Sequence, residues 1–227
     1  MERLLMDIGH NIKAIFFDLD GVLTDVTNIH QEALNYALNE YGYSEINSKQ
    51  FRNSEMLGLS SFDKLKLMGI PESTIPKIVN LKDIKAIEIT QKITEDETNR
   101  YKNINEKLNM LKQLRTLGIK LACVTNSVKT FAENILNTVK QKDMFNVIVT
   151  REDVQNRKPN PDCYLLAMKL LDVDGDSVLS IEDSEKGKRA AETAGIRYVW
   201  KVNNSQEVTI ENVKMHMEKT GELACQK

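Results

Sequence analysis

The apolar residues of this chain fall into short runs, separated by longer stretches in which apolar residues recur at helical spacing. A short apolar run is typical of a strand that is buried on both faces, as in a parallel sheet. We therefore predict five strands. They cover Ala14–Phe17, Lys120–Val124, Val147–Val149, Val178–Ile181 and Tyr198–Val202.

The last four predicted strands alternate with amphipathic segments. The first segment, Glu106–Leu114, has leucines at helical spacing and is followed by Gly118, which suits the C-terminal end of a helix. Further helices are predicted at Phe131–Val139, Pro161–Leu171 and Lys186–Ala194. This alternation predicts an α/β fold, with a Rossmann-like parallel five-stranded core sheet flanked by helices.

The stretch after the first strand lacks strand patterns and is predicted to be a small all-helical domain. Its helices are expected at His30–Tyr41, Gln50–Leu57, Phe62–Met68 and Glu72–Ile93, the last one broken by Pro76. We expect a core domain of residues 1–25 and 104–227 and a helical domain of residues 26–103. Because the insert leaves the sheet directly after the first strand, we expect it to lie over the carboxyl ends of the strands.

The charge balance gives no electrostatic reason to expect nucleic acid or an anionic membrane as a partner. Lysine and arginine number 31 against 33 aspartates and glutamates, and the formal net charge is −2. The N-terminal sequence lacks the apolar core of a signal peptide, and no run approaches the roughly 20 apolar residues of a membrane span. The three cysteines have no metal-binding spacing. We expect a cytoplasmic, reduced setting and a frayed C-terminal segment, Gly221–Lys227.

Two carboxylates, Asp18 and Asp20, follow the first predicted strand. Residues two apart on an extended backbone point the same way, and Gly21 can supply the turn that follows. Ligands of parallel α/β sheets bind beyond the carboxyl ends of the strands, where carboxylate oxygens can hold a divalent cation. The alternative is an ordinary acidic turn. A second acidic stretch, Asp172–Ser177, has its glycine in the wrong place for a calcium loop, and we interpret it as a helix-to-strand turn.

Three more groups of polar residues follow later in the chain. They are Thr125–Ser127, Arg157–Pro161 and Glu182–Ser184. The Thr125 hydroxyl and backbone N–H groups at the start of the next helix could hold a phosphate, and Lys158 offers a compact positive charge on a loop stiffened by prolines. Each group also has an ordinary explanation, as helix N-caps or as a solvated loop charge.

In this order, the motifs at Asp18–Asp25, Thr125–Ser127, Lys158 and Glu182–Ser184 resemble those of the haloacid dehalogenase superfamily. This large group contains aspartate-nucleophile phosphatases and phosphomutases, and the resemblance spans residues 12–203. It implies that Asp18 is the nucleophile that forms an aspartyl-phosphate and that Asp20 is the general acid and base. It also implies that the helical insert is a cap that encloses the active site.

The resemblance further implies a Mg²⁺ cofactor and a set of binding residues. Mg²⁺ would be held by the Asp18 carboxylate, the Asp20 backbone carbonyl and Asp183, with Glu182 as a direct ligand or as a support. The phosphoryl oxygens would be bound by Thr125, the backbone N–H of Asn126 and Lys158. Substrate contacts in the cap are expected at His30, Ser61, Lys64 and Lys82.

Three functions follow from these observations. The leading hypothesis is a Mg²⁺-dependent phosphatase of a small phosphorylated metabolite, such as a sugar phosphate or nucleotide, that works as a monomer, with a dimer left open. The alternative is a phosphomutase of the β-phosphoglucomutase type, although Ser61 stands where such relatives tend to carry arginine and Val26 where a small hydroxyl residue is usual. A non-catalytic binding protein is the third hypothesis, and it is opposed by the complete set of charged motif residues.

Overall fold

The structure is a computed structural model of the chain, and residues 12–51, 59–92 and 104–224 are described, with side chains up to residue 220. The chain separates into two compact units. One consists of Met1–Asp25 with Asp96–Lys227, and the other of Val26–Glu95.

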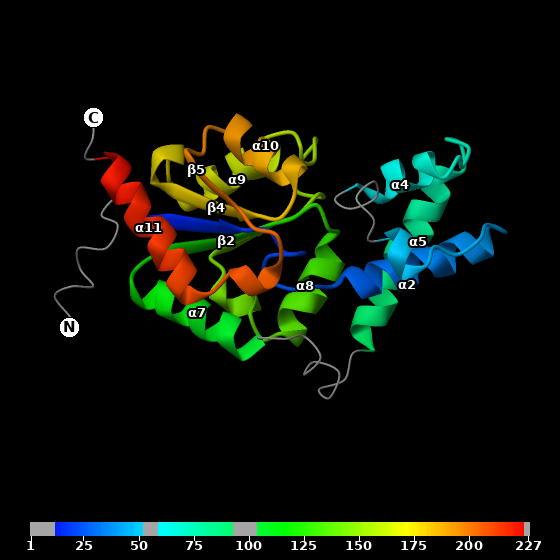
Figure 1. The fold of residues 1–227 in the computed structure, drawn as a ribbon, viewed down its shortest axis with the longest axis horizontal. Coiled ribbons are helices and arrows are strands. Elements are labelled where there is room, and N and C mark those ends of the chain that lie inside the picture. The colour runs from blue at the N-terminus through cyan, green and yellow to red at the C-terminus, as the bar shows by residue number, and fades with distance from the viewer. Residues whose placement is uncertain (1–11, 52–58, 93–103, 225–227) are drawn as a thin grey trace. The chain divides into compact units, whose positions relative to one another are not determined.

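The larger unit contains a five-stranded, all-parallel sheet with the strand order β3-β2-β1-β4-β5 (Figure 1). The strands are β1 (Ala14–Phe17), β2 (Lys120–Val124), β3 (Val147–Val149), β4 (Val178–Glu182) and β5 (Tyr198–Lys201). The predicted α/β fold and its five strands are confirmed. Two strand ends differ from the prediction by single residues, since β4 extends to Glu182 and β5 ends at Lys201.

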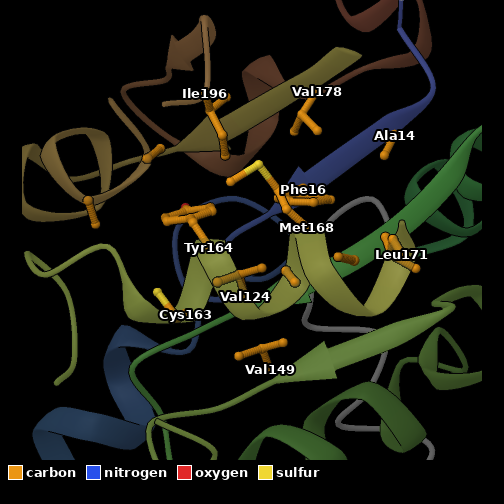
Figure 2. Close-up of a cluster of buried hydrophobic side chains, with 14 residues drawn as sticks. Ala14, Phe16, Val124, Val149, Cys163, Tyr164, Met168, Leu171, Val178 and Ile196 are labelled. Atoms are coloured by element: carbon orange, nitrogen blue, oxygen red, sulfur yellow. The ribbon is translucent and has the colours of Figure 1, made fainter. Parts of the chain in front are cut away.

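The central strand β1 is buried on both faces because all four of its side chains are apolar and none is exposed. Ala14 and Phe16 point into a cluster that includes Tyr164 and Met168 of α9 (Asp162–Leu171), as Figure 2 shows. Side chains alternate between the faces of a strand, so Phe17 lies on the opposite face, where its ring meets Phe145 edge to face.

Helices cover both faces of the sheet (Figure 1). Besides α9, the larger unit has α7 (Ile104–Thr116), α8 (Lys129–Thr138), α10 (Glu185–Thr193) and α11 (Ile210–Ala224). α9 and α10 pack against each other on one side, and α7 and α11 do so on the other. None of the helices that the structure describes combines the length and apolar character needed to cross a bilayer.

The expectation of a frayed segment at Gly221–Lys227 is wrong for its first four residues, which belong to α11. This helix forms because Val213, Met217 and Thr220, at spacings of four and three residues, are all buried. Residues 225–227 of the predicted segment lie outside the described residues.

The described elements of the smaller unit are all helices. They are α2 (Thr27–Glu40), α3 (Ser48–Phe51), α4 (Ser61–Leu67) and α5 (Ile75–Gln91). These helices share a core of their own that includes Leu34, Leu65 and Ile78. The predicted break at Pro76 is wrong, because this proline is in the first turn of α5, where a missing N–H costs no hydrogen bond. Most of the expected helix Gln50–Leu57 lies outside the described residues.

Candidate active site

The register of the sheet brings the ends of three strands together. Phe17, the last residue of β1, is level with Cys123 of β2 and Ile181 of β4. The next residue along, Asp18, therefore lies between Val124 and Glu182, and its backbone N–H donates to the carbonyl of Ile181 at 3.0 Å. Parallel pairing thus joins motifs that are far apart in the sequence.

Lys158 connects these three strand ends. Its Nζ donates to Oδ1 of Asp18 at 2.9 Å, to the carbonyl of Val124 at 2.7 Å and to Oε1 of Glu182 at 2.5 Å. The side chain is 3% exposed, so the alternative of a solvated loop charge is wrong. Burial lowers the pKa of Lys158, but the charges of Asp18 and Glu182 outweigh it and hold the pKa well above its ordinary value. The two carboxylates therefore favour the protonated, cationic form of this lysine.

The side chain of Asn126 holds the backbone of Lys158. Oδ1 of Asn126 accepts from the Lys158 N–H at 3.0 Å, and Nδ2 donates to the Lys158 carbonyl at 3.1 Å. The sequence motif predicted a role only for the backbone N–H of Asn126 and gave no sign of this pair of bonds. Beside it, the buried Thr125 hydroxyl accepts from the N–H of Ser127 at 3.0 Å.

Asp20 lies in the turn that follows β1. The N–H of Gly21 donates to the carbonyl of Thr24 at 2.7 Å, which closes this turn. The Ser127 hydroxyl donates to Oδ2 of Asp20 at 3.3 Å, so the loop after β2 contacts the second carboxylate of the first motif. Ser127 was not among the predicted site residues.

Two glycines leave room for the carboxylates at the end of β4. A Cβ at Gly21, which has a φ of +77°, would collide with the side chain of Asp183, and a Cβ at Gly187 would collide with that of Glu182. The N-cap residue of the helix that follows, α10, is Ser184, whose hydroxyl accepts from the N–H of Gly187 at 3.1 Å. The alternative in which Glu182 and Asp183 serve as N-caps is therefore wrong.

Asp18, Glu182 and Asp183 each offer one oxygen within 4.8 Å of the others. Burial is the main reason why the pKa of Glu182 is raised to about 8 and that of Asp183 to about 7; the neighbouring charge of Asp18 raises both further. Burial also raises the pKa of Asp18 against the opposing effect of Lys158. Oε2 of Glu182 has no hydrogen-bond partner among the described residues. A group of oxygen ligands with excess negative charge fits a hard divalent cation such as Mg²⁺.

The residues that were predicted to contact the substrate beyond the phosphate all belong to the smaller unit. Ser61 is the first residue of α4, and His30 is in α2. Nζ of Lys64 lies 3.8 Å from the centroid of the Phe51 ring, and that of Lys82 lies 3.3 Å from Oδ1 of Asp83. Burial lowers the pKa of Lys64 to about 8, and the charge of Lys82 adds to this effect. The two lysines are thus close enough for their charges to repel.

The chain is similar in sequence and in fold to known proteins. Residues 15–201 match the family described as haloacid dehalogenase-like hydrolase. A phosphorylated carbohydrates phosphatase of Thermotoga maritima is 30% identical over 206 residues, which cover 86% of this chain and 87% of that protein. A β-phosphoglucomutase of Bacillus subtilis is 28% identical over 195 residues, covering 82% and 81% respectively. The crystal structure of a β-phosphoglucomutase from Clostridium difficile has the same fold, with a TM-score of 0.68 at 23% identity over 92% of this chain and 98% of that one.

Proposed function

The chain belongs to the haloacid dehalogenase-like hydrolase family, and on this premise we propose that it is a Mg²⁺-dependent phosphatase of small phosphorylated metabolites. The observation that supports this function best is the contact of Lys158 with Asp18 beside two further carboxylates. A phosphate ester repels an attacking carboxylate, so the attack requires positive charge at the nucleophile. Lys158 supplies one such charge.

In the proposed reaction, a carboxylate oxygen of Asp18 attacks phosphorus and the bond to the leaving oxygen breaks. Asp20 gives its proton to that oxygen, and an alcohol leaves. Asp20 then takes a proton from water, which attacks the aspartyl-phosphate and releases inorganic phosphate and the free Asp18 carboxylate. Thr125 and the backbone N–H of Asn126 would bind the phosphoryl oxygens that do not react.

The residues that would hold Mg²⁺ are Asp18, the backbone carbonyl of Asp20, and Asp183, with Glu182 as a ligand or as a support. A bound Mg²⁺ would neutralise charge on the phosphoryl group and on the carboxylates. The raised pKa values of Glu182 and Asp183 support this assignment, because a group of carboxylates that resists ionisation alone is stabilised by a cation.

The substrate class is proposed from the relatives and from the smaller unit. The relative from Thermotoga maritima is named for phosphorylated carbohydrates, and we propose a sugar phosphate or a metabolite of similar size. Lys64 and Lys82, with His30 and Ser61, would contact the part of the substrate beyond the phosphate. Two neighbouring ammonium groups favour a substrate with an anionic or strongly polar leaving group.

A phosphomutase is the second candidate, and the relative from Bacillus subtilis supports it. Transfer of the phosphoryl group to a second hydroxyl would use the same Asp18. Ser61 and Val26 argue against this alternative, because such relatives tend to carry arginine and a small hydroxyl residue at these places.

A screen of phosphorylated metabolites with Asp18→Asn tests the proposed function. The wild-type protein should release inorganic phosphate from at least one compound when Mg²⁺ is present and lose this activity in excess chelator. Asp18→Asn should lose several orders of magnitude in turnover because it lacks the anionic nucleophile. Asp176→Asn, which changes an aspartate with a 79% exposed side chain in the same unit, is the matched control and should keep full activity. Full activity in Asp18→Asn would disprove the mechanism.

A further inference from the structure

Tyr164 belongs to none of the sequence motifs, but its hydroxyl contacts a residue of the site. Tyr164 lies on α9 and is fully buried. Its ring stacks on that of Phe16, with centroids 6.3 Å apart and planes at 13°, and Figure 2 shows the two side by side in the core. The hydroxyl donates a hydrogen bond to Oε1 of Glu182. A phenylalanine ring would fill the same space, so packing alone does not require this hydroxyl.

The Glu182 carboxylate depends on two donors for its orientation. Oε1 accepts from the Tyr164 hydroxyl and from Nζ of Lys158, the latter at 2.5 Å. Oε2 has no hydrogen-bond partner among the described residues, and the absence of a side chain at Gly187 makes room for this carboxylate. Because a buried carboxylate without donors is costly, loss of either donor leaves Glu182 more dependent on the other.

The ammonium group of Lys158 donates hydrogen bonds to both Glu182 and Asp18. An ammonium group has three N–H donors, and those of Lys158 are all used, since the third acceptor is the carbonyl of Val124. If Glu182 had no other donor, Lys158 would therefore move towards Glu182 and away from Asp18. The Tyr164 hydroxyl is such a donor, and it is neutral.

We propose that Tyr164 is a positioning residue of the active site. Its hydroxyl orients the Glu182 carboxylate, and through Glu182 it keeps Lys158 in contact with Asp18 and the candidate metal ligands in place. Tyr164 itself touches neither the nucleophile nor the substrate in this role. The proposal rests on the proposed function, because its consequence is a change in Mg²⁺ binding and turnover.

Tyr164→Phe removes the hydroxyl and keeps the ring. Tyr198→Phe is the matched control, because Tyr198 is also buried in the larger unit and its hydroxyl donates to the carbonyl of Thr220 at 3.4 Å, outside the site. The Mg²⁺ affinity of the metal-free protein is measured by isothermal titration calorimetry, and kcat and KM by phosphate release. For Tyr164→Phe we expect Mg²⁺ affinity and kcat each to fall by about 10-fold, with little change in KM. Tyr198→Phe should match the wild type in all three.

The outcomes separate the positioning role from its alternatives. Wild-type Mg²⁺ affinity and kcat in Tyr164→Phe would overturn the proposal. Equal losses in both tyrosine variants would also overturn it, since they would indicate a general effect on the fold. If the wild type itself neither binds Mg²⁺ nor releases phosphate, the proposed function fails and the positioning role fails with it. Calorimetry needs no substrate, so a wrongly chosen substrate would not hide the effect on Mg²⁺ binding.

Discussion

The side chain of Asp183 occupies the space in which a Cβ of residue 21 would lie, so Gly21 and Asp183 are sterically linked across the site. Gly21 also has a φ of +77°, a conformation that residues with a side chain rarely adopt. The same glycine therefore serves both the turn after β1 and the placement of a candidate metal ligand at the end of β4. The effect of the positive φ and the effect on Asp183 can be separated by mutation.

We predict that Gly21→Ala impairs Mg²⁺ binding and turnover, whereas Gly118→Ala does not. Gly118 has a similar φ of +78°, but a Cβ at this position would meet no atom within 4 Å. Both substitutions should cost about 1–2 kcal/mol of stability for the positive φ. Only Gly21→Ala must also displace Asp183. Urea unfolding and Mg²⁺ calorimetry on both variants would test this, and equal Mg²⁺ affinity in the two would contradict the steric link.

We predict that Lys158→Met destabilises the metal-free protein by about 3–5 kcal/mol, because it leaves Asp18 and Glu182 buried without their shared cation. Lys201→Met is the control. Lys201 also pairs with a carboxylate at 2.5 Å, that of Glu185, but both side chains of this pair are exposed, and its loss should change stability little. Chemical denaturation gives both values. Similar stability of the two variants would show that the buried cation does not hold the carboxylates together.

The fold could be predicted from the sequence because its strands are short apolar runs and its helices have clear amphipathic spacing. The sequence also indicated that motifs far apart along the chain lie close together, because the carboxyl ends of parallel strands meet at one edge of the sheet. The end of the chain was harder to predict. Residues 221–227 were expected to fray because termini are often poorly ordered, whereas α11 runs on to Ala224. Val213 and Met217 of this helix are buried, and the sequence analysis did not recognise this apolar spacing.

The side-chain contacts within the site could not be predicted in the same way. Tyr164 looks like any aromatic residue on the apolar face of a helix, and its contact with Glu182 depends on how α9 packs on the sheet. Asn126 carries an amide that suits a turn, and nothing in its spacing from Lys158 indicates the paired hydrogen bonds with that backbone. Such contacts depend on tertiary geometry, which a linear pattern does not encode.

The stability of the metal-free protein should fall as the pH rises from 5 towards 7.5. Burial, with the charges of Asp18 and Asp20, raises the pKa of Asp183 from 3.8 to about 7. The folded state therefore binds more protons than the unfolded state between these values, and stability decreases with pH across this window. Glu182, whose pKa is about 8, acts in the same direction.

Thermal unfolding with chelator and with saturating Mg²⁺ measures this effect. With chelator, the Tm of the wild type should fall with pH more steeply than that of Asp183→Asn, which lacks the titrating group. Mg²⁺ should reduce the fall, because it binds the ionised carboxylates and stabilises the folded state. A wild-type Tm with the same pH dependence as that of Asp183→Asn would rule out a raised pKa at this residue.

Asp20→Asn should slow the reaction by about 10²–10⁴-fold for substrates that need a proton on the leaving oxygen. The loss should be much smaller for an aryl phosphate, whose leaving group departs as an anion. Ser127→Ala removes the hydrogen bond to Oδ2 of Asp20 but keeps the acid, so its effect should be weaker and in the same direction. Equal losses in Asp20→Asn for an alkyl and an aryl phosphate would indicate that Asp20 has a structural role instead.

The products formed from a hexose 1-phosphate should decide between the hydrolase and the mutase. A mutase has to keep its aspartyl-phosphate from water while a bisphosphate intermediate turns over, and this requires cationic groups that hold the second phosphate. Ser61 provides no such charge at the place where such relatives tend to carry arginine. We therefore expect phosphate in solution, no conversion to the 6-phosphate, and no stimulation by an added bisphosphate. Phosphorus NMR follows all three species at once. Isomerised sugar phosphate that appears faster than inorganic phosphate would favour the mutase, and Lys64→Ala and Lys82→Ala would then be the variants to test for loss of isomerisation.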